Sequence, residues 1–138
     1  MKTNKILLGG LAGGVTYFFL GWLVYGILLN SYMTANINQC ASRPMEEMIW
    51  WAMILSSLGV GFLLSLVFSW SKTTGIREGV KIAAIIGLLI SSSYDLGSYS
   101  MSHMYNSFSV VLVDVITYSV LLAIVAVVVI LVMGKKEA

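Results

Sequence analysis

Long apolar stretches alternate with short polar connections along the chain, and this pattern predicts the secondary structure. The apolar stretches cover about residues 6–29, 48–70, 80–101 and 108–133. Each reaches the roughly 20 residues that a helix needs to cross about 30 Å of hydrocarbon. None shows the alternating polarity of barrel strands, which are about 10 residues long, so helices are expected. The pattern predicts an all-α, integral membrane four-helix bundle, with residues 1–138 forming a single transmembrane domain.

Composition agrees with this class and excludes others. Of the 138 residues, 59% are hydrophobic and 10% are charged, whereas an ordinary soluble domain has about 25% charged residues. The net charge of +2 reflects scattered cations rather than a basic patch, so no nucleic-acid partner is expected. The lipid bilayer is the predicted environment.

The positions of the cations predict the orientation in the membrane. Arg43 is the only Lys or Arg in the connection between the first two apolar stretches. The other seven lie before the first stretch, between the second and third, or after the fourth: Lys2, Lys5, Lys72, Arg77, Lys81, Lys135 and Lys136. Because cytoplasmic loops carry the excess of Lys and Arg, both termini are predicted to be cytoplasmic in a multi-pass protein of the cell inner membrane.

The first stretch is expected to be retained as a span rather than cleaved as a secretory signal. It runs for about 24 residues, whereas the apolar region of a signal peptide has about 7 to 15. Small residues four positions apart recur in the apolar stretches and favour close approach of helix backbones. The predicted packing positions are Gly10, Gly14, Gly61 and Gly87. Packing within one bundle and packing between two copies are both compatible with this spacing.

Asp95 and Asp114 are the only acidic residues within or against the apolar stretches. A carboxylate near lipid is costly unless a partner, water or an ion receives it, so such residues are candidates for function. Counted from a turn near Met104, the two acids lie about 14 and 15 Å along their helices at 1.5 Å per residue. They are therefore expected at similar depth.

Hydroxyl groups share the predicted helix faces with these acids. On one helix, Ser91 and Tyr99 fall on the face of Asp95, and on the next, Thr117 and Tyr118 fall on the face of Asp114. The predicted polar site consists of Asp95, Asp114, Tyr99, Tyr118, Ser91 and Thr117. Such a pair can share a proton or bind a cation, or the acids can instead accept hydrogen bonds that fix one helix against the other.

The sequence Tyr94-Asp95-Leu96, a short polar turn and then Val113-Asp114 at the start of an apolar last helix carries a resemblance. It resembles small four-helix bacterial inner-membrane proteins of unknown function. The resemblance covers roughly residues 80–125, with a weaker counterpart in the aromatic, Gly-containing segment 21–26. It implies a four-span fold and brings no activity with it.

Enzymatic motifs are absent from the sequence. His103 is the only histidine, Cys40 is the only cysteine, and no HExxH, CxxC, GxSxG or phosphate-loop motif occurs. The chain is therefore predicted not to be an enzyme and to hold no cofactor and no metal, since a zinc site needs three or four convergent ligands.

Three function classes remain open. The first is a structural or accessory bundle, acting alone or as a subunit of a membrane complex, in which Asp95→Asn would lower expression or assembly with no flux to lose. The second is a small proton- or cation-coupled transporter acting as a homodimer, in which the same substitution would abolish uptake and preserve folding. The third is a membrane enzyme acting on a lipid-like substrate through both acids.

Overall fold

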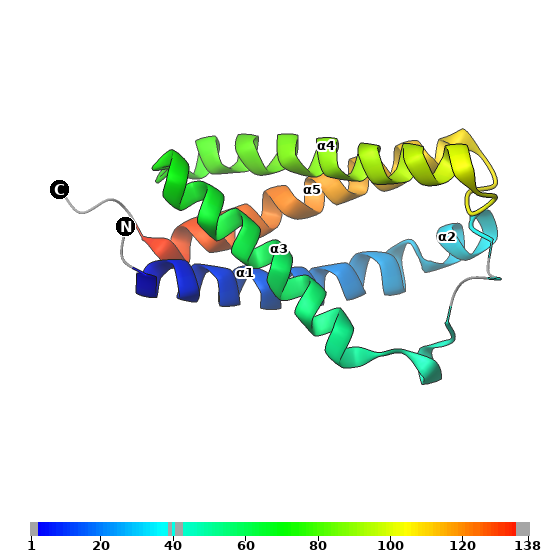
Figure 1. The fold of residues 1–138 in the computed structure, drawn as a ribbon, viewed down its shortest axis with the longest axis horizontal. Helices are drawn as coiled ribbons and strands as arrows, with labels where there is room; N and C mark the ends of the chain where they lie inside the picture. The colour runs from blue at the N-terminus through cyan, green and yellow to red at the C-terminus, as the bar shows by residue number, and fades with distance from the viewer. Residues whose placement is uncertain (1–2, 39, 41–42, 135–138) are drawn as a thin grey trace.

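The computed structural model describes residues 3–38, 40 and 43–134, which fold into an all-α bundle (Figure 1). The elements in chain order are α1 (Thr3–Leu23), the π-helix η1 (Val24–Leu28), α2 (Asn30–Asn36), the 3-10 helix η3 (Met45–Glu47), α3 (Trp50–Ser71), α4 (Ile76–Met101) and α5 (Phe108–Met133). This part of the chain thus has five α-helices, where the sequence predicted four. Lys2, Lys135 and Lys136, which contributed to the orientation prediction, lie outside the described residues.

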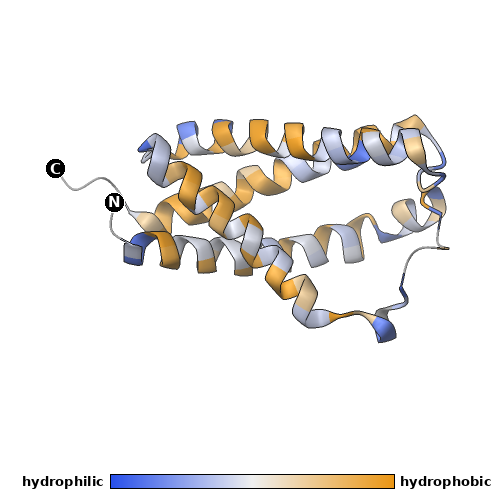
Figure 2. Cartoon of the chain, in the orientation of Figure 1, coloured by the Kyte–Doolittle hydropathy of each residue, from blue (hydrophilic) through white to orange (hydrophobic). Residues whose placement is uncertain are grey.

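Four helical segments are long and apolar enough to cross a membrane: Thr3–Leu28, Trp50–Ser71, Ile76–Met101 and Phe108–Met133. Large apolar side chains on their outer faces are exposed, and Leu89 and Leu131 have 61% and 63% of their surface accessible. Such a surface would aggregate in water, whereas lipid solvates it. Figure 2 shows hydrophobic residues along the long helices, with hydrophilic residues mostly toward the ends. The protein is a small multi-pass helical membrane protein in contact with the lipid bilayer.

The additional helix, α2, lies in the connection between the first two predicted apolar stretches, where no helix was expected. Its Asn, Ser and Thr residues have modest helix propensity. Tertiary packing outweighs this, because Met33 of α2 is buried in a cluster with Tyr105, Val110 and Val111, and Tyr32 packs against the same cluster. The helix is therefore held by its contacts with residues more than seventy positions away in the sequence.

The bundle has two distinct ends (Figure 1). The start of α1, the end of α5 and the α3–α4 link (residues 72–75) lie at one end, which we call the terminal end. The α2 helix and the α4–α5 connection (residues 102–107) lie at the other, which we call the loop end. Near the loop end, α3 diverges from the other helices, so its first residues are separated from α4 and α5.

Close backbone contact joins α1 to α3. The buried glycines of α1 are Gly9, Gly10, Gly13 and Gly14. A Cβ atom at Gly61 of α3 would collide with the backbone of Gly10 and Gly14, so neither side of this crossing has room for a side chain. Such contact gives helices in lipid the van der Waals packing that drives their association.

A second seam joins α4 to α5. Its α4 side consists of buried residues at every fourth position: Gly79, Ala83, Gly87, Ser91 and Asp95. A Cβ at Gly87 would lie 2.9 Å from Cα of Ser119, so α4 and α5 approach closely at that level. The small-residue seam ends in Asp95, and an acid thereby enters the interface between two helices.

Candidate functional site

The structure brings Asp95 and Asp114 together on the neighbouring helices α4 and α5, in the half of the bundle nearer the loop end. Asp95 is only 2% exposed and Asp114 is half-buried. Their carboxyl groups are close enough to interact directly with each other. We call these two residues the acid pair.

Tyr25 is the hydrogen-bond donor to one member of the pair. Its hydroxyl group donates to Oδ1 of Asp114 over 2.7 Å, joining residues 89 positions apart in the sequence. Tyr25 belongs to η1, where the first span changes from α-helical to π-helical geometry. A π-helical turn inside a longer helix shifts the direction of the side chains that follow it, and such turns are frequent at functional sites.

Tyr105 is the donor to the other member. Its hydroxyl group donates to Oδ1 of Asp95 over 2.8 Å, and its side chain is 7% exposed. Burial raises the pKa of this hydroxyl well above its usual range, and the hydrogen bond to Asp95 adds to the effect. Tyr105 therefore stays neutral and remains a donor at physiological pH.

The backbone around Tyr105 is fixed by a short antiparallel bridge to the segment after α2. The amide of Asn38 donates to the carbonyl of Met104 over 2.7 Å, and the amide of Asn106 donates to the carbonyl of Asn36 over 2.9 Å. These bonds satisfy backbone groups that would otherwise be unpaired beside an apolar cluster. The connection that carries Tyr105 is thus anchored to a distant part of the chain.

One oxygen of the acid pair lacks a partner. Oδ2 of Asp95 is buried and has no hydrogen bond among the described residues, although the Asp114 carboxyl group lies nearby. An unsatisfied, buried, charged oxygen is strongly unfavourable. A proton on Oδ2 removes that cost, because the protonated oxygen can donate a hydrogen bond to the Asp114 carboxylate.

A metal ion suits the site less well than a proton. Within residues 3–38, 40 and 43–134, no group of three or more His, Cys, Asp or Glu side chains converges on a point. Two carboxyl groups, each already accepting a tyrosine hydroxyl at Oδ1, supply fewer oxygens than the roughly six or more ligands that Ca²⁺ or Mg²⁺ takes. The arrangement is chemically suited to hold one proton between two acids.

The other residues of the predicted polar site are placed differently. Ser91 donates to the carbonyl of Gly87 within α4, over 2.7 Å. Tyr99 is exposed and its ring packs edge-on against Phe108. Thr117 is half-buried on α5. Ser91 thus bonds within its own helix, and Tyr99 is accessible at the surface of the bundle.

Tyr118 lies nearer the acids. It is close enough to Asp114 to interact with it electrostatically, and its ring meets that of Tyr17 edge-on with centroids 6.2 Å apart. Tyr17 belongs to α1, so this aromatic contact joins the first span to α5 at a second residue besides Tyr25. The structure thus places Tyr118 in the region of Asp114, whereas the ring contact of Tyr99 is with Phe108.

Sequence reasoning missed the two donors. Tyr25 stands in an aromatic run of an apolar stretch, and Tyr105 stands in a turn whose conformation the sequence did not specify. No local spacing links either residue to an acid, because Tyr25 reaches Asp114 only through the packing of α1 on α5. The sequence indicated only that a tyrosine hydroxyl group in an apolar stretch requires a hydrogen-bond partner, and it did not indicate which residue that partner is.

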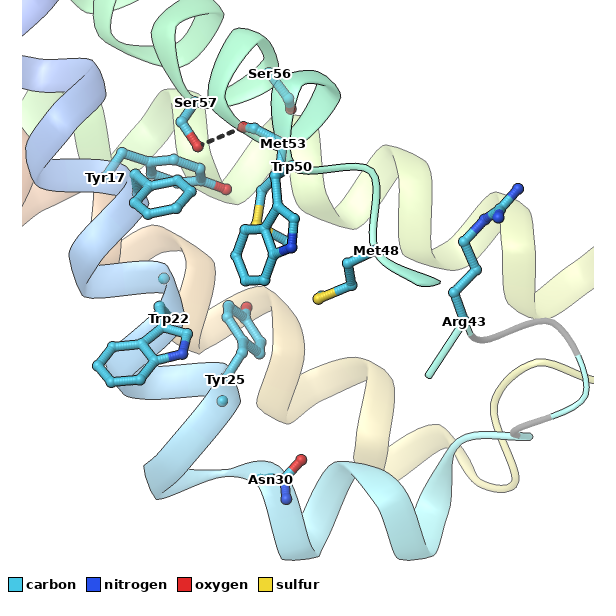
Figure 3. A pocket seen from close by; sticks show the side chains of 13 residues that line it. Tyr17, Trp22, Tyr25, Asn30, Arg43, Met48, Trp50, Met53, Ser56 and Ser57 are labelled. Atoms are coloured by element: carbon cyan, nitrogen blue, oxygen red, sulfur yellow. Dashed lines mark hydrogen bonds between the residues drawn. The ribbon is translucent and has the colours of Figure 1, made fainter. Parts of the chain in front are cut away.

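A cavity of about 640 Å³ opens beside Tyr25 (Figure 3). It lies between the second half of the first span and the start of α3, where α3 diverges. Its lining consists of Tyr17, Phe18, Gly21, Trp22, Tyr25, Gly26, Asn30, Arg43, Met48, Trp50, Met53, Ser56 and Ser57. Tyr25 thus contributes to the wall of the cavity and also donates its hydroxyl to Asp114.

Comparisons with known proteins were made with family models, curated proteins and solved structures, and none matches this chain. The four-helix family suggested by the Tyr94-Asp95-Leu96 and Val113-Asp114 patterns is therefore not identified. What the helices support is a small membrane protein with four spans.

Proposed function

We propose that the protein is a structural or accessory helix bundle of a bacterial inner membrane, and that the acid pair holds one proton and fastens the loop end of the bundle. The observation that carries this proposal is the convergence of four segments on two carboxyl groups. Tyr25 from η1 and Asp114 from α5 form one bond, while Tyr105 from the α4–α5 connection and Asp95 from α4 form the other.

The proton belongs on Oδ2 of Asp95 in this proposal. That atom is the unpartnered one, and Asp95 is more deeply buried than Asp114. With the proton there, Asp95 is a neutral donor and Asp114 is a carboxylate that accepts from both Asp95 and Tyr25. Every buried polar group of the site then has a partner, which is the condition for a polar network to stabilise an apolar interior.

The function follows from what this network connects. Hydrogen bonds between transmembrane helices contribute about 0.6 kcal/mol on average, and those to charged groups in proteins about 1.5–3 kcal/mol. Several such bonds at the loop end complement the glycine crossing of α1 and α3, which lies nearer the terminal end. The acid pair thereby holds η1, α4 and α5 together at the end of the bundle where α3 has diverged. We call this set of hydrogen bonds the acid-pair clasp.

We also propose that both termini face the cytoplasm. Lys5, Lys72, Arg77 and Lys81 belong to the terminal end, whereas Arg43 belongs to the loop end. The excess of cations at one end of the bundle supports a cytoplasmic terminal end under the positive-inside rule. The loop end, with the acid pair beneath it, then faces the periplasm.

The alternative is a proton-coupled transporter acting as a homodimer, and proton flux separates the two. The protein is reconstituted in vesicles that enclose a pH-sensitive dye, and a proton gradient is imposed. If the acid pair is only structural, the change of internal pH that the dye reports should equal that of protein-free vesicles, both for the wild type and for Asp95→Asn. A flux in the wild type that Asp95→Asn abolishes, with the variant still folded, would contradict the structural proposal.

A further inference from the structure

The cavity between the first span and α3 has the size and position of a ligand site. Its volume of about 640 Å³ lies within the roughly 300–1,000 Å³ typical of small-molecule pockets. It forms because α3 crosses α1 at the glycine contact and then leads away from it toward the loop end (Figure 1). The opening therefore lies between two membrane-spanning helices.

The walls of this cavity are aromatic and apolar. Tyr17, Trp22 and Tyr25 come from the first span, and Trp50 and Met53 come from the start of α3 (Figure 3). Trp22 and Trp50 remain 48% and 44% exposed, so neither ring is covered by the chain itself. A long apolar group fits such walls, and it would enter from the hydrocarbon phase.

The rim has the opposite character. Asn30 and Arg43 border the cavity at the loop end, and Arg43 is the only Lys or Arg between residues 6 and 71. Its side chain extends from the rim away from the aromatic walls, which leaves the guanidinium group at the edge rather than inside (Figure 3). Glu46 and Glu47 follow in η3, but neither lines the cavity.

We propose that this cavity binds one anionic amphiphile from the membrane, with its acyl chain between the first span and α3 and its phosphate or carboxylate at Arg43. The guanidinium group suits either headgroup, because its planar fork of N–H donors matches two oxygens of a phosphate or carboxylate. The division of the site into an apolar slot and a single cationic edge matches the division of an amphiphile into chain and head. This site is distinct from the acid pair, although Tyr25 borders both.

Gly21 offers a way to fill the slot without disturbing the fold. It lines the cavity, and a Cβ atom added to it would meet nothing within 4 Å. A leucine at this position would project into the space that the acyl chain would occupy. Gly97 of α4 has equally open surroundings and does not line the cavity, so Gly97→Leu is the matched control.

Native mass spectrometry after mild extraction measures the bound lipid, with three probes added separately: dioleoyl phosphatidylglycerol, oleate and neutral dioleoylglycerol. The proposal predicts a defined complex of one anionic lipid per chain and weak binding of dioleoylglycerol. Gly21→Leu should weaken binding of the anionic probe at least tenfold, whereas Gly97→Leu should leave it unchanged. Preference for phosphatidylglycerol or for oleate distinguishes a phospholipid from a free fatty acid.

Arg43→Gln tests the headgroup contact independently and lies in an exposed connection where folding is not at stake. It should weaken binding of the anionic probes several-fold and leave dioleoylglycerol unaffected. Tyr105→Phe removes a donor to the acid pair and does not touch the cavity, so it should bind the probe as the wild type does even if the acid-pair clasp is weakened. Equal binding of all three probes, or binding that neither Gly21→Leu nor Arg43→Gln reduces, would show lipid on the outer surface only and overturn the proposal.

Discussion

The hydroxyl group of Tyr105 donates a 2.8 Å hydrogen bond to Oδ1 of Asp95, ten residues earlier in the chain. The α4–α5 connection thus folds back over the end of α4 and covers its buried acid. The backbone pairing of this connection with residues 36–38 holds it in that position. A connection at the end of two helices is therefore an integral part of the polar site below it.

Removing the Tyr105 hydroxyl should destabilise the loop end. Tyr105→Phe leaves a buried oxygen of Asp95 without its donor, and such a loss costs about 1–3 kcal/mol. The expected result is a lower midpoint temperature of thermal unfolding in detergent, measured by circular dichroism. Tyr94→Phe is the control and should have almost no effect, because Tyr94 is 66% exposed on α4, the helix that carries Asp95. Equal midpoints for the two variants would contradict the role assigned to Tyr105.

Two substitutions of Asp95 should differ in their effects. If Oδ2 carries a proton, the amide nitrogen of Asp95→Asn takes the place of the protonated oxygen and still donates to Asp114. Asp95→Leu keeps the approximate size but leaves the Tyr105 hydroxyl and the Asp114 carboxylate without this partner. Because the amide of the Asn variant mimics a protonated carboxyl group, we expect this variant to accumulate near wild-type levels, which revises the lower expression that the sequence alone suggested for a structural bundle. The Leu variant should be several kcal/mol less stable. Loss of both variants to the same degree would argue for an ionised Asp95.

The crossing of α1 and α3 should tolerate no side chain on the α3 side. Gly61→Ala places a methyl group against the backbone of Gly10 and Gly14, which cannot move aside as a flexible side chain would. Overpacking of this kind costs about 1–3 kcal/mol or more. Gly59→Ala, two residues away with nothing within 4 Å of its added Cβ, is the control. Thermal unfolding in detergent should separate the two, and a destabilised Gly59→Ala would contradict the packing described here.

The orientation of the bundle can be measured with the only cysteine of the chain, Cys40, which is exposed in the connection at the loop end. A membrane-impermeant maleimide added to intact cells should label it, since the loop end is proposed to face the periplasm. In the double variant Cys40→Ser/Lys72→Cys, the thiol stands at the terminal end and should react only after permeabilisation. The reverse pattern would invert the proposed topology.

The four spans could be predicted because the rule behind them is local. An apolar run either is or is not long enough to cross a bilayer, and the stretches ending at Met101 and Met133 end there in the structure as well. Helix α2 could not be predicted in this way. Its formation depends on Met33 packing into a cluster with Tyr105, and no property of the connection itself indicates that contact.

The polar site shows the same division. Equal distances from a turn led to the expectation that Asp95 and Asp114 lie at similar depth, and their carboxyl groups do lie within reach of each other. Helical periodicity also placed Tyr99 on the face of Asp95, and in the structure Tyr99 is exposed with its ring packed against Phe108. The true donors come from a π-helical turn and a folded-back connection, and both geometries depend on the assembled bundle.

Infrared spectroscopy of protein labelled with ¹³C in its aspartate side chains tests the central claim most directly, because Asp95 and Asp114 are the only two aspartates in the chain. At neutral pH the account predicts two signals of equal weight, the C=O stretch of one protonated carboxyl group and the bands of one carboxylate. Asp95→Asn should remove the protonated signal and leave the carboxylate. Two carboxylate signals and no protonated one in the wild type at neutral pH would contradict the shared proton.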